Sequence, residues 1–231
     1  MTGLAVAIEA VHMVYRLQDA EVNALAGVDL VIEPGDAVAL LGPSGSGKST
    51  LLTLLAGLHT ASSGSIRLDG QDLGAMSERA LLGLRARDVG LVMQGPARNL
   101  LPYAVAEDNL RFAQRAVPRD RRGALPEPAG LLELLGLGHV RRSPLGALSG
   151  GEQQRLSLAV GLSSAPRLLL ADEPTSQLDT SSQQAVIDLL ATASAAGTTV
   201  VVVTHDEHVA DQMHRTVVMH DGLIVSESTR T

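Results

Sequence analysis

The sequence predicts an α/β fold with a mostly parallel sheet, an antiparallel β part at the N-terminus and an inserted helical part. Apolar runs of strand length alternate with helical stretches over most of the chain, which is typical of a parallel sheet. Up to about Gly35, apolar and polar residues alternate instead, which favours short antiparallel strands. Residues 95–149 hold leucine-rich helical pieces and no convincing strand. We therefore expect one domain over residues 1–231, with a helical subdomain over about 95–160 inserted in its core.

The strands are expected in the following order. Val28–Ile32 ends the alternating region, and Pro34 and Gly35 then form a turn. Ala37–Leu41 is continuously apolar, as in a strand that is buried on both faces. Further strands are expected at Ser65–Leu68, Val89–Met93, Leu168–Ala171 and Val200–Val203. Residues 216–227 read as two strands joined at Asp221 and Gly222. Helices are expected at residues 51–58, 76–86, 131–136, 152–163 and 181–194.

Composition limits the classes of protein that the chain can belong to. Apolar residues make up 45% of the 231 residues and charged residues 19%, which is a globular composition. The net charge of −7 disfavours a nucleic-acid binder, which would carry a basic stripe, so no nucleic-acid partner is expected. Without cysteine, neither disulfides nor thiolate sites can form. The most apolar run, Thr199–Val203, is far shorter than the ~18 residues of a membrane helix, and the N-terminus does not read as a signal peptide.

A phosphate-binding loop follows the buried strand Ala37–Leu41. Residues 42–50 read GPSGSGKST, and a leucine-rich helix comes next, so the loop has the strand–loop–helix context that a P-loop requires. Glycines let backbone N–H groups turn toward phosphate oxygens, and the helix N-terminus adds positive potential. Lys48, the only lysine of the chain, would reach the β- and γ-phosphates, and Ser49 would offer its hydroxyl to Mg²⁺. The expected nucleotide-binding residues are Gly42, Pro43, Ser44, Gly45, Ser46, Gly47, Lys48, Ser49 and Thr50.

Two acids end the apolar strand at Leu168–Ala171. Asp172 is expected beside the P-loop, where it can hold Mg²⁺ opposite Ser49. The carboxylate of Glu173 points elsewhere and can polarise the attacking water. Acids after a strand are common, and the P-loop upstream is what favours a catalytic pair.

The string LSGGEQQR at Leu148–Arg155 separates this chain from other P-loop enzymes, because it resembles the signature of the ATP-binding cassette family. The resemblance spans nearly the whole chain. It implies a P-loop NTPase core of the RecA-like kind and an ATPase that needs ATP and Mg²⁺. It also implies a second nucleotide-binding subunit, most simply another copy, whose P-loop faces this signature across shared ATP.

The same resemblance implies roles for further residues. Gln94 would ligate Mg²⁺ and sense the γ-phosphate, and His205 would hold the γ-phosphate and the attacking water, so the expected catalytic set is Glu173, His205, Gln94 and Lys48. For Gln94, the alternative is a plain glutamine at a strand end. For Tyr15, the alternative to an adenine-stacking ring is an ordinary strand residue. The other expected nucleotide contacts are Tyr15, Ser149, Gly150, Gly151, Glu152 and Asp179. The six other histidines show no metal-ligand spacing and are expected to be solvated or packed.

Two stretches resemble the macrolide-exporter and lipoprotein-release branch, which also includes a cell-division cassette: residues 70–94 and LLPYAVAEDNL at 100–110. The resemblance implies integral membrane permease partners and a place on the cytoplasmic face of the cell membrane. Residues 95–99, GPARN, and Gln177 in the segment Ser176–Asp179 depart from the family pattern. Two alternatives stay open: an ATP-driven regulator of a non-transporting membrane partner, and a soluble cassette ATPase. The solute and the direction of transport are not predicted.

Overall fold

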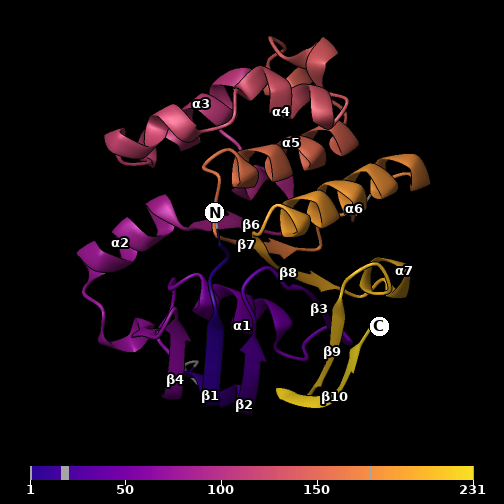
Figure 1. Cartoon of the computed structure of the whole chain (residues 1–231). Helices are drawn as coiled ribbons and strands as arrows, with labels where there is room; N and C mark the ends of the chain where they lie inside the picture. Colours follow the sequence, from indigo (N-terminus) through magenta and orange to yellow (C-terminus); the bar gives the residue numbers. More distant parts are fainter. Residues whose placement is uncertain (1, 17–20, 177, 231) are drawn as a thin grey trace.

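The computed structural model describes residues 2–16, 21–176 and 178–230 and forms two sheets with helices between and around them (Figure 1). The smaller sheet has the order β2-β1-β4-β5 and is antiparallel throughout. Its strands are β1 (Val6–Arg16), β2 (Glu21–Ile32), β4 (Ser63–Leu68) and β5 (Gln71–Asp72). The antiparallel part that the sequence predicts is confirmed.

The first two strands are longer than the short strands expected, with 11 and 12 residues. The reason is an irregularity inside β1, where Ala10 takes a positive φ of 46° and the pairing register shifts between Ile8 and Val11. Glu9 and Ala10 are both exposed, so the alternation of buried and exposed residues breaks in the middle of one continuous strand. In the sequence, such a break reads as the end of a strand.

The larger sheet has the order β10-β9-β3-β8-β7-β6, and all of its neighbours pair in parallel except β9 and β10. Its strands are β3 (Ala37–Leu41), β6 (Val89–Val92), β7 (Leu168–Asp172), β8 (Thr199–Thr204), β9 (Arg215–His220) and β10 (Leu223–Thr229). Asp221 and Gly222 join the last two strands with positive φ at both positions, as a two-residue hairpin requires. This mostly parallel sheet confirms the predicted fold class.

The parallel strands are buried on both faces, which explains their continuous apolar runs. Leu168 and Leu170 belong to the core that also contains α1 (Lys48–Leu55) and the antiparallel sheet. Leu169 and Ala171, which point the other way, belong to a second core beneath the helices between β6 and β7. Figure 1 shows these two layers on opposite sides of β3, β7 and β8.

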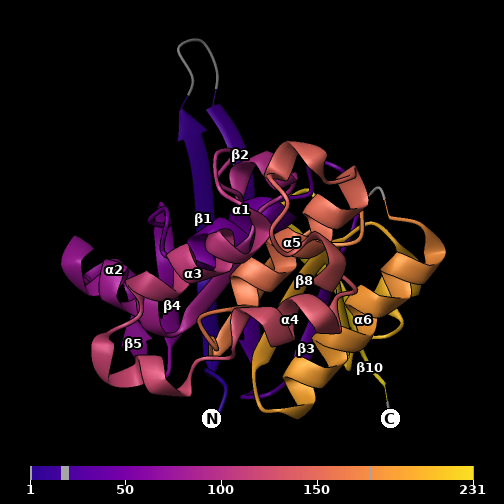
Figure 2. The same cartoon turned by 90° about the horizontal axis from the view of Figure 1, so that it is seen from above.

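Residues 93–167, all of them described, contain α3 (Ala106–Ala116), α4 (Pro128–Leu134) and α5 (Gly150–Leu162), with only an isolated bridge between Val105 and Pro144. We call residues 95–160 the helical segment. Viewed from above, α3 and α4 lie over α5, and the β1–β2 hairpin projects beyond the rest of the chain (Figure 2). One short 3-10 turn, η1 (Leu73–Ala75), lies between β5 and α2. Four others lie before or between the helices of the helical segment: η2 (Pro96–Arg98), η3 (Arg119–Ala124), η4 (Gly138–Val140) and η5 (Leu145–Ala147).

Three helices outside the helical segment complete the fold: α2 (Glu78–Arg87), α6 (Thr180–Ala195) and α7 (Glu207–Ala210). The helix after the P-loop begins at Lys48 instead of residue 51, because the loop itself forms the first turn and Gly47 is its cap. The helix expected at 131–136 begins at Pro128, a favoured first residue that the leucine pattern did not include. At both helix starts, no side chain makes a capping hydrogen bond.

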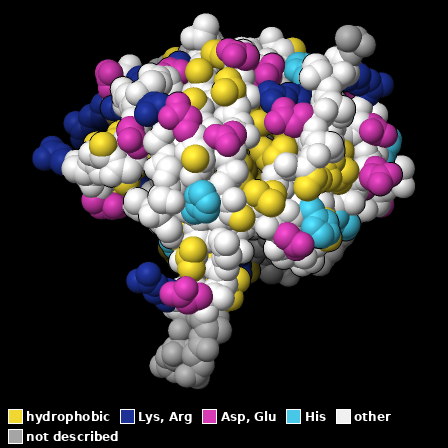
Figure 3. All heavy atoms as spheres, turned by 90° about the horizontal axis from the view of Figure 1, so that it is seen from below, with side chains coloured by type: hydrophobic (Ala, Val, Ile, Leu, Met, Phe, Trp, Pro, Cys, Tyr) yellow, Lys and Arg dark blue, Asp and Glu magenta, His cyan; other side chains and the backbone are white. Residues whose placement is uncertain are grey.

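No helix in the described part of the chain is long and apolar enough to span a membrane. On the face seen from below, acidic and basic side chains are interspersed and form no basic stripe (Figure 3).

Candidate functional site

The P-loop joins β3 to α1 and keeps the conformation that its glycines allow. Gly42, Gly45 and Gly47 have φ of 152°, 83° and 98°. A side chain at Gly42 would collide with the carbonyl of Met219, and one at Gly47 with the carbonyl of Ala24. The loop can therefore pass close to β2 and β9 and still present its N–H groups at the start of α1.

The ammonium of Lys48 lies inside this loop, and the residue is only 7% exposed. Its Nζ donates to the carbonyls of Gly42 at 2.7 Å and Pro43 at 2.8 Å, and to Oγ of Ser46 at 3.3 Å. Burial lowers the pKa of Lys48, and the negative charges of Glu173 and Asp172 oppose that effect. Since these two carboxylates are close enough to act on Lys48, the lysine, the loop and the end of β7 form one site.

Asp172 ends β7 and is 6% exposed. Burial raises the pKa of Asp172, while a hydrogen bond from Ser49 and the positive charges of Lys48 and Arg98 oppose the rise. Its Oδ1 is buried and has no hydrogen-bond partner among the described residues. A buried, unpaired carboxylate oxygen beside a serine hydroxyl fits a hard divalent cation, which prefers oxygen ligands.

Glu173 and His205 meet where the neighbouring strands β7 and β8 end. Nδ1 of His205 lies 2.8 Å from Oε1 of Glu173, and this contact raises the pKa of His205. The Glu173 side chain is 12% exposed and that of His205 is 72% exposed. Glu173 adopts a φ of 50°, which is unusual for a residue with a side chain, and donates its N–H to the carbonyl of Val203. The backbone thus turns sharply at the residue expected to act as the base.

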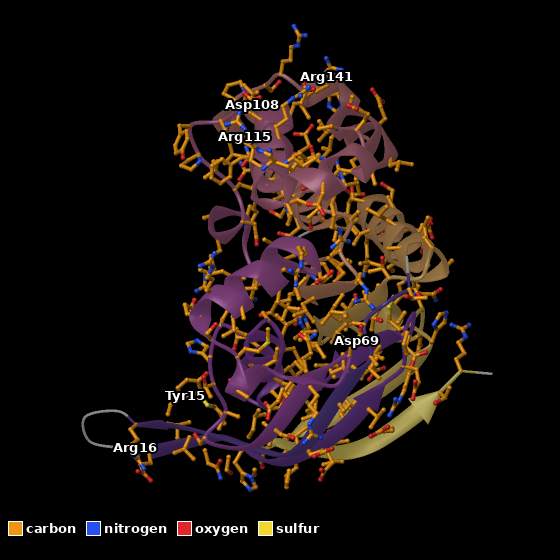
Figure 4. All side chains as sticks on the ribbon, turned by 60° about the vertical axis from the view of Figure 1, so that its left-hand side comes forward. Tyr15, Arg16, Asp69, Asp108, Arg115 and Arg141 are labelled. Carbon is orange, nitrogen blue, oxygen red and sulfur yellow. The ribbon has the colours of Figure 1, made fainter. Side chains whose placement is uncertain are left out.

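A cavity of about 670 Å³ brings most of the expected residues together. The P-loop from Ser44 to Thr50 lines it, as do Gln94, Asp172, Glu173 and His205. Tyr15 also lines the cavity and packs edge-on against His59, with ring centroids 6.5 Å apart. Figure 4 places Tyr15 toward the projecting end of the β1–β2 hairpin, away from Asp108, Arg115 and Arg141 on the helical segment. Val22, Asn23 and Ala24 of β2 and Val203 of β8 complete the lining, and sequence reasoning did not include these four residues in the site.

Seven expected residues do not line this cavity: Gly42 and Pro43 at the start of the P-loop, and Ser149, Gly150, Gly151, Glu152 and Asp179. Ser149 caps α5, and Gly150 and Gly151 begin that helix, with Gly150 facing open space. Glu152 closes a capping box with Ser149. Asp179 caps α6 by accepting from the backbone and hydroxyl groups of Ser181 and Ser182, and these hydrogen bonds lower its pKa strongly. Gln177, just before this cap, lies outside the described residues.

Sequence reasoning also missed Gln154. This side chain is 3% exposed, and its Nε2 donates to the carbonyls of Glu173 at 3.2 Å and Pro174 at 3.1 Å. It therefore ties α5 to the backbone that carries the expected base. Its place inside the string at 148–155 was the available signal, but the string alone does not say which glutamine turns inward.

The fold and the cavity together define a P-loop nucleotide-binding ATPase with a helical segment between β6 and β7. The chain belongs to the ABC transporter family, whose model matches residues 25–176. It is an ATP-binding cassette and an ATPase, as the sequence predicted.

Curated relatives confirm the predicted branch. The chain is 40% identical to the lipoprotein-releasing system ATP-binding protein LolD of Shewanella frigidimarina, covering 94% of this chain and 91% of that protein. It is 38% identical to the macrolide export ATP-binding/permease protein MacB of Bdellovibrio bacteriovorus over 95% of this chain. It spans only 33% of that second relative's length.

A solved structure supports the fold and a dimeric form for cassettes of this kind. The ATP-binding cassette MJ0796, in a dimeric post-hydrolysis state bound to ADP and Pi, matches with a TM-score of 0.89 and 31% identity. The match covers 98% of this chain and 99% of that one.

Proposed function

We propose that two copies of this chain enclose ATP between the P-loop cavity of one copy and the start of α5 of the other. The observation that carries this proposal is the separation of two phosphate-type sites within one chain. The P-loop lines the cavity, whereas the N-terminus of α5 at Ser149–Gly151 lies outside it with Gly150 toward open space. A helix N-terminus favours an anion, so the second site is available to a phosphate held by another chain. The dimeric form of the related cassette MJ0796 supports this arrangement.

We propose that the nucleotide binds together with Mg²⁺, and that Asp172, Ser49 and Gln94 hold the ion. The unpaired Oδ1 of Asp172 and the Ser49 hydroxyl beside it support this assignment. When bound, Mg²⁺ neutralises charge on the β- and γ-phosphate oxygens. The ammonium of Lys48 would exchange its hydrogen bonds to the carbonyls of Gly42 and Pro43 for bonds to the same phosphate oxygens. It can do so because it rotates on a flexible stem.

Within this site, Glu173 polarises the attacking water and His205 orients Glu173. Their contact of 2.8 Å supports these roles, because a base that is fixed by a second side chain presents one carboxylate oxygen to the water. Tyr15, at the edge of the cavity, offers a ring face for a nucleobase. Asp179, fixed as the cap of α6, would meet the second copy near the shared nucleotide.

We propose further that ATP-driven closure powers an integral membrane permease in an export or lipoprotein-release system, at the cytoplasmic face of the membrane. The names of the relatives LolD and MacB support this proposal. An exposed aromatic surface supports it as well, since Tyr103 is 83% exposed and Phe112 55% exposed beside the segment that follows Gln94. Residues 1–231 would act as one domain in which the helical segment moves with the permease.

A mixing experiment tests the shared site. Lys48→Ala disables the cavity of its own chain, and Ser149→Arg blocks the α5 terminus of its own chain. If sites are shared, each variant alone has no intact site, whereas a mixed dimer joins the intact cavity of the second variant to the intact Ser149 of the first. We expect ATP trapping to appear only on mixing, as one nucleotide per dimer. If the mixture traps no more ATP than the two variants trap separately, the shared site is overturned.

A further inference from the structure

The hydroxyl of Ser149 is engaged by a carboxylate of its own helix. Oε2 of Glu152 accepts from Oγ of Ser149 at 2.8 Å and from its backbone N–H at 2.8 Å. The backbone N–H of Glu152 in turn donates to Oγ of Ser149 at 3.3 Å. Both donors that Ser149 offers are therefore directed at Glu152, and a negative charge lies beside the place where a phosphate would bind.

A histidine outside the signature string holds the other oxygen of this carboxylate. Nε2 of His139, on η4, lies 3.0 Å from Oε1 of Glu152, and contacts with Ser149 and His139 lower the pKa of Glu152. The His139 side chain is 66% exposed and that of Glu152 is 17% exposed. The pair thus lies at the surface, next to the helix end that the proposed function assigns to the second copy.

Other charged groups around His139 have their own partners or positions. Glu133 of α4 lies against the backbone of Gly138, where a side chain would collide with its carboxylate. Arg141, on the same turn of chain, pairs with Glu107 of α3 at 3.1 Å. Arg142 also acts on Glu107. Of these groups, only His139 is placed to offset the charge of Glu152.

We propose that His139 is a positioning residue that acts on Ser149 through Glu152. The imidazole holds the Glu152 carboxylate and offsets its charge while Ser149 binds the terminal phosphate of the ATP held by the second copy. This inference rests on the proposed function. A carboxylate beside an anion site repels phosphate, and a charged donor on its far oxygen weakens that repulsion. A protonated imidazole offsets the carboxylate charge and a neutral one does not, so association of two copies around ATP is tighter at acidic pH than at basic pH.

The measurement uses the full chain carrying Glu173→Gln, which keeps ATP from being consumed. Association with saturating Mg-ATP is followed by analytical ultracentrifugation at pH 6, 7 and 8, and ATP affinity is measured at low protein concentration. We expect His139→Gln to weaken association about tenfold at pH 6 and by much less at pH 8, and to leave ATP affinity unchanged. His139→Lys, which stays charged, restores tight association at pH 8. His220→Gln is the matched control, because His220 also pairs with a carboxylate, Asp221 at 3.1 Å, away from α5.

The protonation of ATP and of His205 also changes with pH, but it does so equally in all these variants. Only the difference in association between the variants therefore reports on His139. Equal association of His139→Gln and its parent at every pH would overturn the inference. So would a loss that is the same at pH 6 and pH 8 and that His139→Lys does not restore. If the parent itself does not associate with ATP, the proposed function fails instead.

Discussion

Nδ1 of His205 lies 2.8 Å from Oε1 of Glu173, although 32 residues separate them in the chain. The contact exists because β7 and β8 are parallel neighbours, with Asp172 opposite Val203 in the pairing register. The residue after each strand therefore emerges at the same edge of the sheet. This pairing links the expected base to an exposed histidine of the cavity, and two predictions depend on it.

Glu173→Gln should stop hydrolysis and preserve ATP binding. The amide is the same size but does not take a proton from water, and general-base catalysis contributes about 10²–10⁴-fold. We expect phosphate release to fall by at least 100-fold and an ATP-bound dimer to elute early in size-exclusion chromatography. Glu207→Gln, at an exposed position on α7, is the control and should behave as the parent chain does. A monomeric and fully active Glu173→Gln chain would contradict both the base and the dimer.

The contact also predicts a pH-dependent stability. The pKa of His205 is raised in the folded chain by Glu173, so the protonated imidazole stabilises the fold. This stabilisation is complete below the ordinary histidine pKa of about 6.5 and is lost as the pH rises through the higher, folded-state value. The difference in Tm between the parent and His205→Gln should therefore be largest near pH 6 and shrink toward pH 9. A difference that grows with pH would show that the sign is wrong.

Gln154 should matter for both stability and hydrolysis. Gln154→Leu removes the donor to the carbonyls of Glu173 and Pro174, and leaving buried acceptors unpaired costs about 1–3 kcal/mol. For a chain of this size, we expect Tm to fall by about 2–4 °C per kcal/mol. Hydrolysis per folded molecule should fall as well, because the backbone at Glu173 loses its tie to α5. Gln184→Leu, on the exposed side of α6, should change neither quantity.

The sequence predicted those parts of the site whose elements and functional residues follow one another directly along the chain. β3, the P-loop and α1 follow one another directly, so residues 37–55 could be placed together from the local sequence pattern alone. The strand order β10-β9-β3-β8-β7-β6 could not, because it depends on which distant strands pair. His139 illustrates the limit. As a single histidine without metal-ligand spacing it was expected to be solvated or packed, and its partner Glu152 becomes visible only when η4 folds back onto α5.

Lys48→Ala should abolish useful ATP binding, and Lys48→Arg should not rescue it. Charge-assisted hydrogen bonds contribute about 1.5–3 kcal/mol each, so losing the ammonium should weaken ATP binding by at least about 100-fold. Arginine keeps the charge, but its planar fork does not fit where Nζ now lies within 3.3 Å of three loop oxygens. Equilibrium binding of a fluorescent ATP analogue measures both variants. Tight binding by Lys48→Arg would show that charge alone suffices.

The last prediction concerns the aromatic surface of the helical segment, formed by Tyr103 and Phe112. A concave area joins these rings to Leu101, Asp108, Arg111 and Arg115. Large exposed apolar side chains that gather beside charged ones mark surfaces for protein partners. Neither ring lines the ATP cavity, so replacing them should leave the chemistry of the isolated chain intact.

We therefore expect Tyr103→Ala combined with Phe112→Ala to preserve the ATPase activity of the isolated chain and to lower its stimulation by a co-expressed permease at least tenfold. Burying two aromatic side chains at an interface contributes several kcal/mol, which is enough for that change. Co-purification from detergent and ATPase assays in proteoliposomes measure the two effects. Val225→Ala, at another exposed apolar position on β10, is the matched control. If the double variant still co-purifies and is fully stimulated, the permease contacts a different surface.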